Sequence, residues 1–273
     1  MNANNCLIYC DMDGTMLSDW SLGPFVPEKN LHAMRRFMAA GGAVSIASGR
    51  QLDDVMVHFP GLRFNAPLVL GNGTLIQDCA DRRVHFESPL TRPFKEACLQ
   101  LAERLPYVFL LPNNHEHVTQ VLLGDDRDHG RLALAKSYVS REEFLESDAF
   151  IKMVYVLEDD RADLMPELEA AVNAAPVLRD MLINKSSPVF LETYNRDAGK
   201  ANGVRRAAAL AGMSGRTLIC IGDYYNDADM LRAADLAVCP SNAPADIRAM
   251  CSIVTCGNNE GAVGDLIERL EQL

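Results

Sequence analysis

The sequence lacks several features that would assign it to whole classes of protein. Its 273 residues contain no run of Lys and Arg, and the net charge is −11. A nucleic-acid partner needs a basic face, so the composition argues against one. No apolar run approaches the roughly 18 residues of a membrane-spanning helix, and the first five residues lack the positive charge of a signal peptide. We therefore expect a soluble cytoplasmic protein without membrane contact.

Paired cysteine motifs are also missing. The eight cysteines are scattered along the chain, none forms a Cys-x-x-Cys pair, and several lie in apolar runs such as 218–221. Buried free thiols in a reducing compartment explain this distribution better than disulfides or a zinc site.

Alternating apolar and amphipathic segments in the first and last thirds predict an α/β fold. Strands are expected at 7–9, 43–47, 67–70, 217–221 and 236–238, and helices at 28–40, 201–211, 227–234 and 261–270. The middle has one-sided strands at 84–86, 107–111, 117–123, 151–157 and 189–192, with helices at 92–104 and 161–174, as in an antiparallel sheet with helices on one face. We predict a doubly wound parallel-sheet core from residues 1–86 and 190–273, with an α+β domain at 87–189 inserted in it.

The segment 11–15 reads Asp-Met-Asp-Gly-Thr and closes the first predicted strand. Asp11 is suited to attack phosphorus, and Asp13 to handle the proton of the leaving group. Gly14 lets the backbone approach an anionic ligand, because it carries no Cβ. Two neighbouring carboxylates repel each other unless a cation lies between them, so the motif also requires a metal. Alone, the segment is equally compatible with an acidic turn that caps a strand.

Three further segments at strand ends extend this pattern. Ser48 and Gly49 follow a strand and open a helix, where a hydroxyl and N–H groups would hold a phosphate. Lys200 begins a helix and offers a point charge for the same anion. After the strand 217–221, Asp223 and Asp227 supply the oxygen donors that Mg²⁺ prefers. A helix cap, a surface lysine and a charged helix start explain each segment alone, but all lie in one α/β domain.

Together the four segments resemble the haloacid dehalogenase superfamily of phosphotransferases. The Ser-Gly-Arg at 48–50, the Asn-Gly at 72–73 and the Gly-Asp-x-x-Asn-Asp-x-x-Met that ends at Met230 are similar to its Cof-type sugar phosphatases. The resemblance implies that the inserted domain is a type IIB cap, which sets substrate specificity. It also implies a Mg²⁺-dependent phosphatase of a small phosphorylated metabolite, a sugar phosphate being the leading candidate, in a monomer or homodimer.

The resemblance further implies a role for each matching residue. Asp11 would be the nucleophile that forms an aspartyl-phosphate, and Asp13 the general acid and base. Mg²⁺ would be held by Asp11, the backbone carbonyl of Asp13 and Asp223, with Asp227 close by or acting through water. The residues expected to bind the phosphate are Gly14, Thr15, Ser48, Gly49, Lys200 and Asn226.

Two alternatives to a phosphatase stay open. A phosphomutase of the same fold would use Asp11 and Asp13 but return the phosphoryl group to substrate instead of water. A non-catalytic phosphometabolite-binding protein would keep the fold without turnover. The presence of Asp11, Asp13, Lys200 and Asp223 argues against this second alternative.

Other conspicuous residues are given structural roles. His115 and His117 lack matching carboxylates and are expected on a surface or packed on a strand. The acidic segment 125–129 is expected to be a solvated loop. Trp20, in the segment 17–27 after the nucleophile, is expected to pack.

Overall fold

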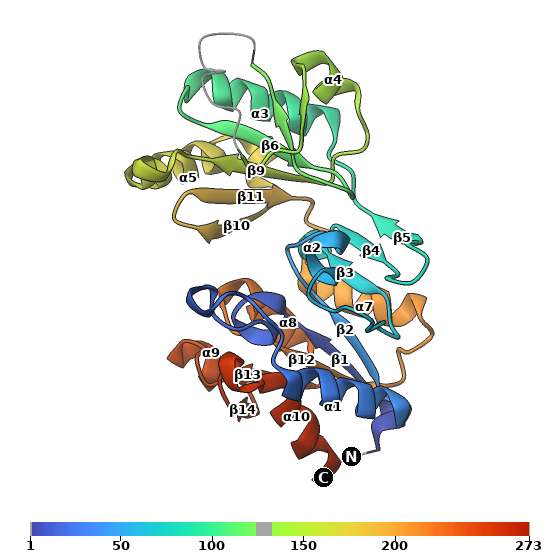
Figure 1. Ribbon diagram of the computed structural model, residues 1–273. Coiled ribbons are helices and arrows are strands. Elements are labelled where there is room, and N and C mark those ends of the chain that lie inside the picture. Colours follow the sequence, from blue (N-terminus) through green and yellow to red (C-terminus); the bar gives the residue numbers. More distant parts are fainter. Residues whose placement is uncertain (1, 124–132, 273) are drawn as a thin grey trace. The chain divides into compact units, whose positions relative to one another are not determined.

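A computed structural model describes residues 2–123 and 133–272 of the chain, which divides into two compact units (Figure 1). The first comprises Met1–Phe86 and Lys200–Leu273, and the second Glu87–Gly199. The second unit thus extends to Gly199 instead of ending at residue 189. The reason is that β11 (Phe190–Tyr194) pairs antiparallel with β9 (Lys152–Val156) and β10 (Leu182–Ser187). Among the described helices, none has the length and apolar composition needed to cross a membrane.

A five-stranded parallel sheet forms the centre of the first unit, in the order β14-β13-β12-β1-β2. Its strands are β1 (Cys6–Cys10), β2 (Ala43–Ile46), β12 (Thr217–Ile221), β13 (Leu236–Pro240) and β14 (Ile253–Thr255). Every residue of β1 is buried, as expected for a central strand covered on both faces. Cys10 is in register with Ile46 and with Ile221, so β1, β2 and β12 end level with one another. Open α/β sheets bind ligands at this edge.

Helices cover both faces of this sheet. They are α1 (Glu28–Ala39), α2 (Leu52–Met56), α7 (Lys200–Leu210), α8 (Ala228–Ala233), α9 (Ala245–Ala249) and α10 (Ala262–Gln272). On one face, Leu7 and Tyr9 of β1 share a core cluster with Val204 and Ala207 of α7. Helices α1 and α10 lie side by side, contact β2, β13 and β14, and contribute no residue to that cluster (Figure 1). The doubly wound α/β fold predicted from the sequence is confirmed.

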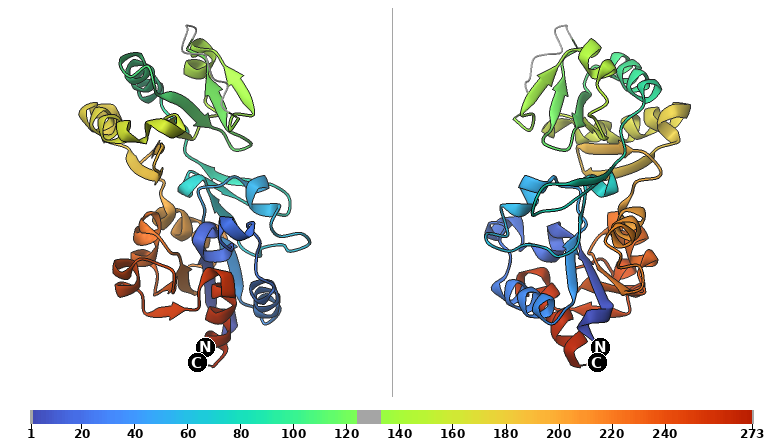
Figure 2. Two further views of the ribbon diagram at one scale, coloured as in Figure 1. Left: turned by 60° about the vertical axis from the view of Figure 1, so that its left-hand side comes forward. Right: turned by 90° about the vertical axis from the view of Figure 1, so that its right-hand side faces the viewer.

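A smaller sheet and several short turns complete the first unit. The sheet has the order β3-β4-β5 and connects to the residue after β2 through a parallel bridge between Ala47 and Val69. Its strands are β3 (Leu68–Leu70), β4 (Leu75–Gln77) and β5 (Val84–Glu87). The turns are η1 (Ala3–Asn5), η2 (Met12–Met16), η3 (Trp20–Leu22), η4 (Gly71–Gly73), η7 (Tyr225–Asp227) and η8 (Asn258–Glu260). The start of the described chain and the end of α10 lie close together in this unit (Figure 2).

The second unit is an antiparallel sheet with helices on one face. The sheet has the order β10-β11-β9-β6, with β6 at Phe109–Asn113, and β7 (Thr119–Val121) pairs separately with β8 (Ser137–Val139). The helices are α3 (Arg92–Arg104), α4 (Arg141–Glu146), α5 (Met165–Ala174) and α6 (Pro176–Arg179), with the turn η6 at Asp159–Leu164. Tyr155 and Leu191 pack in one cluster with Phe94 of α3 and Leu168 of α5. This is the predicted α+β architecture.

Polar contacts join the points where the chain enters and leaves the second unit. Ser88 Oγ donates a hydrogen bond of 3.0 Å to Asp197 Oδ1, and Asn195 Nδ2 donates one of 2.9 Å to Ser88 Oγ. Residues 109 positions apart in sequence are therefore neighbours at the base of this unit.

Candidate active site

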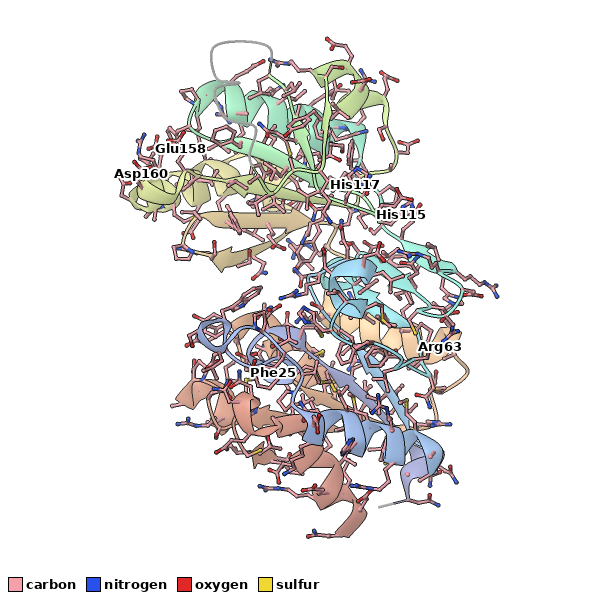
Figure 3. All side chains as sticks on the ribbon, in the orientation of Figure 1. Phe25, Arg63, His115, His117, Glu158 and Asp160 are labelled. Carbon is pink, nitrogen blue, oxygen red and sulfur yellow. The ribbon has the colours of Figure 1, made fainter. Side chains whose placement is uncertain are left out.

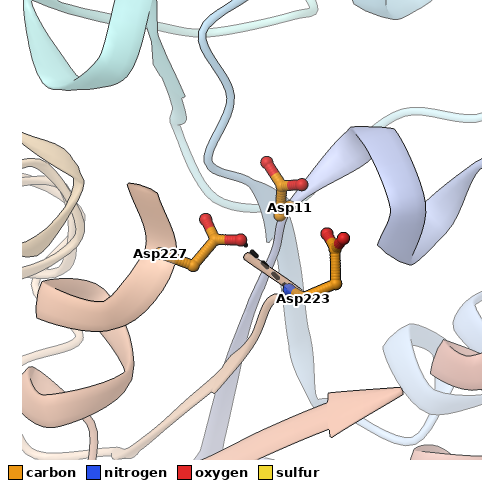
Figure 4. Close-up of side chains that lie close together, drawn as sticks. All are labelled: Asp11, Asp223 and Asp227. Carbon is orange, nitrogen blue, oxygen red and sulfur yellow. Dashed lines mark hydrogen bonds between the residues drawn. The ribbon is translucent and has the colours of Figure 1, made fainter. Parts of the chain in front are cut away.

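Three carboxylates meet at the carboxyl edge of the parallel sheet. Asp11 directly follows β1, and its backbone N–H continues the sheet ladder to the carbonyl of Ile221 in β12. Asp223 follows β12 by two residues, and Asp227 ends the turn η7. One oxygen from each of Asp11, Asp223 and Asp227 lies within 4.8 Å of the others (Figure 4). The strand register thus brings together residues more than 200 positions apart.

Lys200 neutralises part of this negative charge. Its Nζ lies 2.5 Å from Asp11 Oδ1 and 2.6 Å from Asp227 Oδ1, and all three side chains are buried. Asp227 also accepts hydrogen bonds at Oδ2 from the backbone N–H groups of Asp223, at 3.1 Å, and Tyr224. Removing Lys200 would leave the carboxylates of Asp11 and Asp227 without their cation in the interior, which is strongly unfavourable.

Burial changes the protonation of these groups. Burial, and after it the charge of Asp227, raises the pKa of Asp11 well above its usual range. The same two causes raise the pKa of Asp223 to about 7. For Lys200, burial opposes the charged form, but the charges of Asp11 and Asp227 outweigh it and raise the pKa of the ammonium group. A bound divalent cation would reverse the trend for the carboxylates, because it favours their ionised form.

The donor set suits a hard divalent cation. Three carboxylates at one point supply only oxygen ligands, which is the chemistry that Mg²⁺ requires. Asp11 shares Lys200 with Asp227, and Asp227 also accepts hydrogen bonds from two backbone N–H groups. Among the residues that the structure describes, no other group of three or more His, Cys, Asp or Glu side chains converges in this way.

Gly14 and Thr15 lie against Asp223. Gly14 has a φ of +77°, and a Cβ there would lie 2.3 Å from Asp223 Oδ2. Thr15 Oγ1 donates a hydrogen bond of 2.9 Å to Asp223 Oδ1. Asn242 Nδ2 donates to the Gly14 carbonyl at 2.9 Å, which fixes the turn from the far side. The two residues expected to bind phosphate therefore also shape the position of Asp223.

Asp13 lies apart from the three-carboxylate group. Its side chain is 46% exposed and forms an ion pair with Arg50, in which Nη2 lies 2.6 Å from Asp13 Oδ1. Binding of a metal by the Asp13 backbone carbonyl stays a prediction. The contact with Arg50 was not predicted, although Arg50 directly follows the Ser-Gly pair that sequence reasoning singled out.

The remaining predicted phosphate ligands occupy different environments. Ser48 is 1% exposed just after β2, and its Oγ accepts a hydrogen bond from the Arg50 backbone N–H. Gly49 packs closely on Asn72, since a Cβ there would lie 3.0 Å from Asn72 Oδ1. Asn226 is exposed in η7, and the structure describes no hydrogen bond from it to the carboxylates.

The structure contradicts one of the predicted structural roles and agrees with another. Trp20 is 68% exposed, so the prediction that it packs is wrong. His115 and His117 lie on the second unit (Figure 3), where His117 Nε2 is 2.8 Å from Ser137 Oγ, in agreement with a strand-packing role. The predicted solvated loop at 125–129 lies outside the described residues.

Nearly the whole chain is similar to known proteins. The Bacillus subtilis phosphatase YwpJ is 26% identical over 97% of this chain and 99% of its own length. The Escherichia coli 5-amino-6-(5-phospho-D-ribitylamino)uracil phosphatase YbjI is 25% identical over 97% of this chain and 95% of its own. Among solved structures, the haloacid dehalogenase subclass IIB sugar phosphatase BT4131 matches with a TM-score of 0.75 at 19% identity, over 98% of this chain and 100% of its own.

A family model also matches most of the chain. It describes haloacid dehalogenase-like hydrolases and matches residues 8–267, which include Asp11, Lys200, Asp223 and Asp227. The chain therefore belongs to the family of haloacid dehalogenase-like hydrolases.

Proposed function

We propose that this haloacid dehalogenase-like phosphatase is Mg²⁺-dependent and hydrolyses a small phosphorylated metabolite through an aspartyl-phosphate on Asp11. The observation that carries the proposal is the position of Asp11 at the ladder end, ion-paired to Lys200 and within 4.8 Å of Asp223 and Asp227. Mg²⁺, when bound, would be held by Asp11, Asp223 and the backbone carbonyl of Asp13, with Asp227 behind them, and would screen the nucleophile from the phosphate.

In the first step a carboxylate oxygen of Asp11 attacks phosphorus, and the bond from phosphorus to the substrate oxygen breaks. Asp13 gives a proton to that departing oxygen. In the second step Asp13 takes a proton from water, the water oxygen attacks phosphorus, and the bond to Asp11 breaks. Asp13 suits both roles because its side chain is half exposed and follows the buried Asp11 by two residues in the sequence.

The charge that develops on the transferred phosphoryl group requires fixed donors. Lys200 offers its ammonium group, and the backbone N–H groups of η2 follow the nucleophile directly. Ser48 offers a buried hydroxyl at the neighbouring strand end. Gly14, Thr15, Gly49 and Asn226 complete the proposed phosphate site.

A sugar phosphate is the substrate class that we favour. A structural neighbour is a sugar phosphatase, and YbjI is named for a substrate with a phosphorylated ribityl chain. We propose that the second unit acts as a type IIB cap and supplies the selecting side chains. The eight cysteines are all free, which agrees with a reducing, cytoplasmic location. A monomer or homodimer, with no nucleic-acid or membrane partner, completes the proposal.

Phosphate release from a panel of phosphorylated sugars, sugar alcohols and nucleotides, with and without Mg²⁺, tests the proposal. We expect Mg²⁺-dependent release that is abolished in Asp11→Asn, while circular dichroism shows an unchanged fold. Transfer to a second hydroxyl without net phosphate release would instead identify a phosphomutase. Tight binding without any turnover would identify a phosphometabolite-binding protein.

A further inference from the structure

The guanidinium group of Arg50 binds the carboxylate of Asp13 through two parallel hydrogen bonds, an arrangement called a fork. Its Nε donates a hydrogen bond of 2.8 Å to Asp13 Oδ2, and its Nη2 donates one of 2.6 Å to Asp13 Oδ1. Paired hydrogen bonds of this kind fix the direction of a carboxylate as well as its distance, because both groups are planar. Asp13 is 46% exposed, so without such a partner its side chain would be free to change rotamer.

Arg50 is itself held from several sides. Its backbone N–H donates to Ser48 Oγ at 3.2 Å, and its carbonyl accepts from the Gly71 N–H at 3.1 Å. Its Nη1 donates to the carbonyl of Asp54 in α2 at 3.4 Å. The guanidinium carbon lies 5.5 Å from the ring centre of the exposed Trp20. Arg50 is therefore anchored to three other elements of the first unit, namely η3, η4 and α2.

The fork leaves Asp13 able to react. A carboxylate has about four acceptor sites, and Arg50 uses one on each oxygen. One acceptor site on each oxygen is left for a proton that moves to or from a substrate. Arg50 has no acceptor and does not lose its own proton in proteins, so it orients Asp13 without competing for that proton.

We propose that Arg50 is the positioning residue for Asp13 and holds its carboxylate in the orientation for proton transfer to the leaving oxygen. The inference rests on the proposed function, because it assumes that Asp13 is the general acid. The segment Ser48-Gly49-Arg50 would then have two roles, because Ser48 would bind the phosphate and Arg50 would orient Asp13.

The dependence of activity on the leaving group shows whether Arg50 positions the acid or only supports the fold. An alkyl phosphate needs a proton on its departing oxygen, whereas p-nitrophenyl phosphate leaves readily without one. In Arg50→Ala we expect kcat/KM for an alkyl phosphate to fall about 10- to 100-fold, and kcat/KM for p-nitrophenyl phosphate to fall less than about threefold. Arg50→Lys keeps the charge but loses the fork, so its losses should approach those of Arg50→Ala.

A matched pair elsewhere in the first unit controls for the loss of an arginine fork. Arg36 in α1 makes the same two bonds to Glu271 in α10, at 2.9 and 3.0 Å. Arg36→Ala and Arg36→Lys should change kcat/KM for both esters equally and by less than about twofold. Equal losses for the two esters in Arg50→Ala, or no loss for either, would overturn the proposal.

A crystal structure of Arg50→Ala tests the positioning directly, whatever the enzyme's activity. We expect the Asp13 carboxylate to leave its wild-type position or to occupy more than one rotamer. An Asp13 side chain that keeps its single position in the variant would refute the role of Arg50. Failure of the proposed function is recognised separately, since the wild type would then release no phosphate from either ester with Mg²⁺.

Discussion

Gly14 lies so close to Asp223 that position 14 has no room for a side chain. A Cβ on Gly14 would lie 2.3 Å from Asp223 Oδ2 and 2.8 Å from its carboxyl carbon, well inside van der Waals contact. The turn after Asp11 and the turn after β12 therefore meet at a backbone atom on one side and a proposed metal ligand on the other.

Gly14→Ala should displace Asp223 and lower the affinity for Mg²⁺ by at least tenfold, as measured by calorimetry. The control is Gly212→Ala, because Gly212 follows α7 with a similar positive φ, +67°, but no atom lies within 4 Å of the added Cβ. Both variants should lose about 1–2 kcal/mol of stability from the left-handed backbone. Equal Mg²⁺ affinity in the two variants would contradict the role given to this contact.

Mg²⁺ binding should depend on pH through Asp223. The folded-state pKa of about 7 is above the ordinary 3.8, so the folded metal-free protein holds this proton more tightly than the unfolded chain. Its stabilising effect is present below about pH 4 and is lost as the pH rises to about 7. Since Mg²⁺ must displace the proton of Asp223, this group alone should make the apparent affinity rise about tenfold per pH unit up to about pH 7. Calorimetric titrations across this range measure the effect, and a flat profile would exclude Asp223 as the titrating ligand.

Thr15→Val should shift that profile to higher pH. The hydrogen bond from Thr15 lowers the pKa of Asp223, so its loss should move the midpoint upward by about one pH unit. Thr74→Val is the matched control, because Thr74 Oγ1 makes a buried bond of 3.0 Å to the Gly71 carbonyl instead. An unchanged midpoint in Thr15→Val would show that the bond does not stabilise the ionised form of Asp223.

Lys200→Met should destabilise the metal-free protein by about 3–5 kcal/mol, because it leaves Asp11 and Asp227 buried without their partner. Added Mg²⁺ should recover part of this loss by supplying positive charge, and thermal melts with and without Mg²⁺ measure the recovery. Lys152→Met, which breaks the buried pair with Glu192 in the second unit, is the control and should gain no more from Mg²⁺ than the wild type. Equal Mg²⁺ responses in the two variants would contradict a metal site beside Lys200.

The carboxylate group was predictable from the sequence for a simple geometric reason. Asp11 and Asp223 each follow an apolar run that can only be a buried strand, and parallel strands end at one edge of a sheet. Asp227 follows β12 closely and Lys200 begins a helix, so both were expected at the same edge. Strand ends alone place these residues, whatever the directions of their side chains.

The contact between Arg50 and Asp13 was not predictable in the same way. It depends on how far a long side chain reaches and in which direction, and the two residues are 37 positions apart. Trp20 was assigned to packing because tryptophan is usually buried, whereas it lies on the short turn η3 and is exposed. The inserted unit was predicted to end at residue 189, whereas it extends to Gly199. The extension was missed because β10, with exposed polar positions, gives little strand signal, and β11 pairs with it.

The contacts of Ser88 with Asp197 and Asn195 have an evolutionary consequence. They bring the two ends of the inserted unit together. The insertion therefore connects β5 and α7 over a short distance, as a loop would. An unrelated domain with equally close ends could replace it without moving β1, β12 or Lys200. Because this unit is the proposed cap, recognition of the substrate and chemistry could then diverge at separate rates, and one reaction centre could be inherited by descendants that act on different molecules.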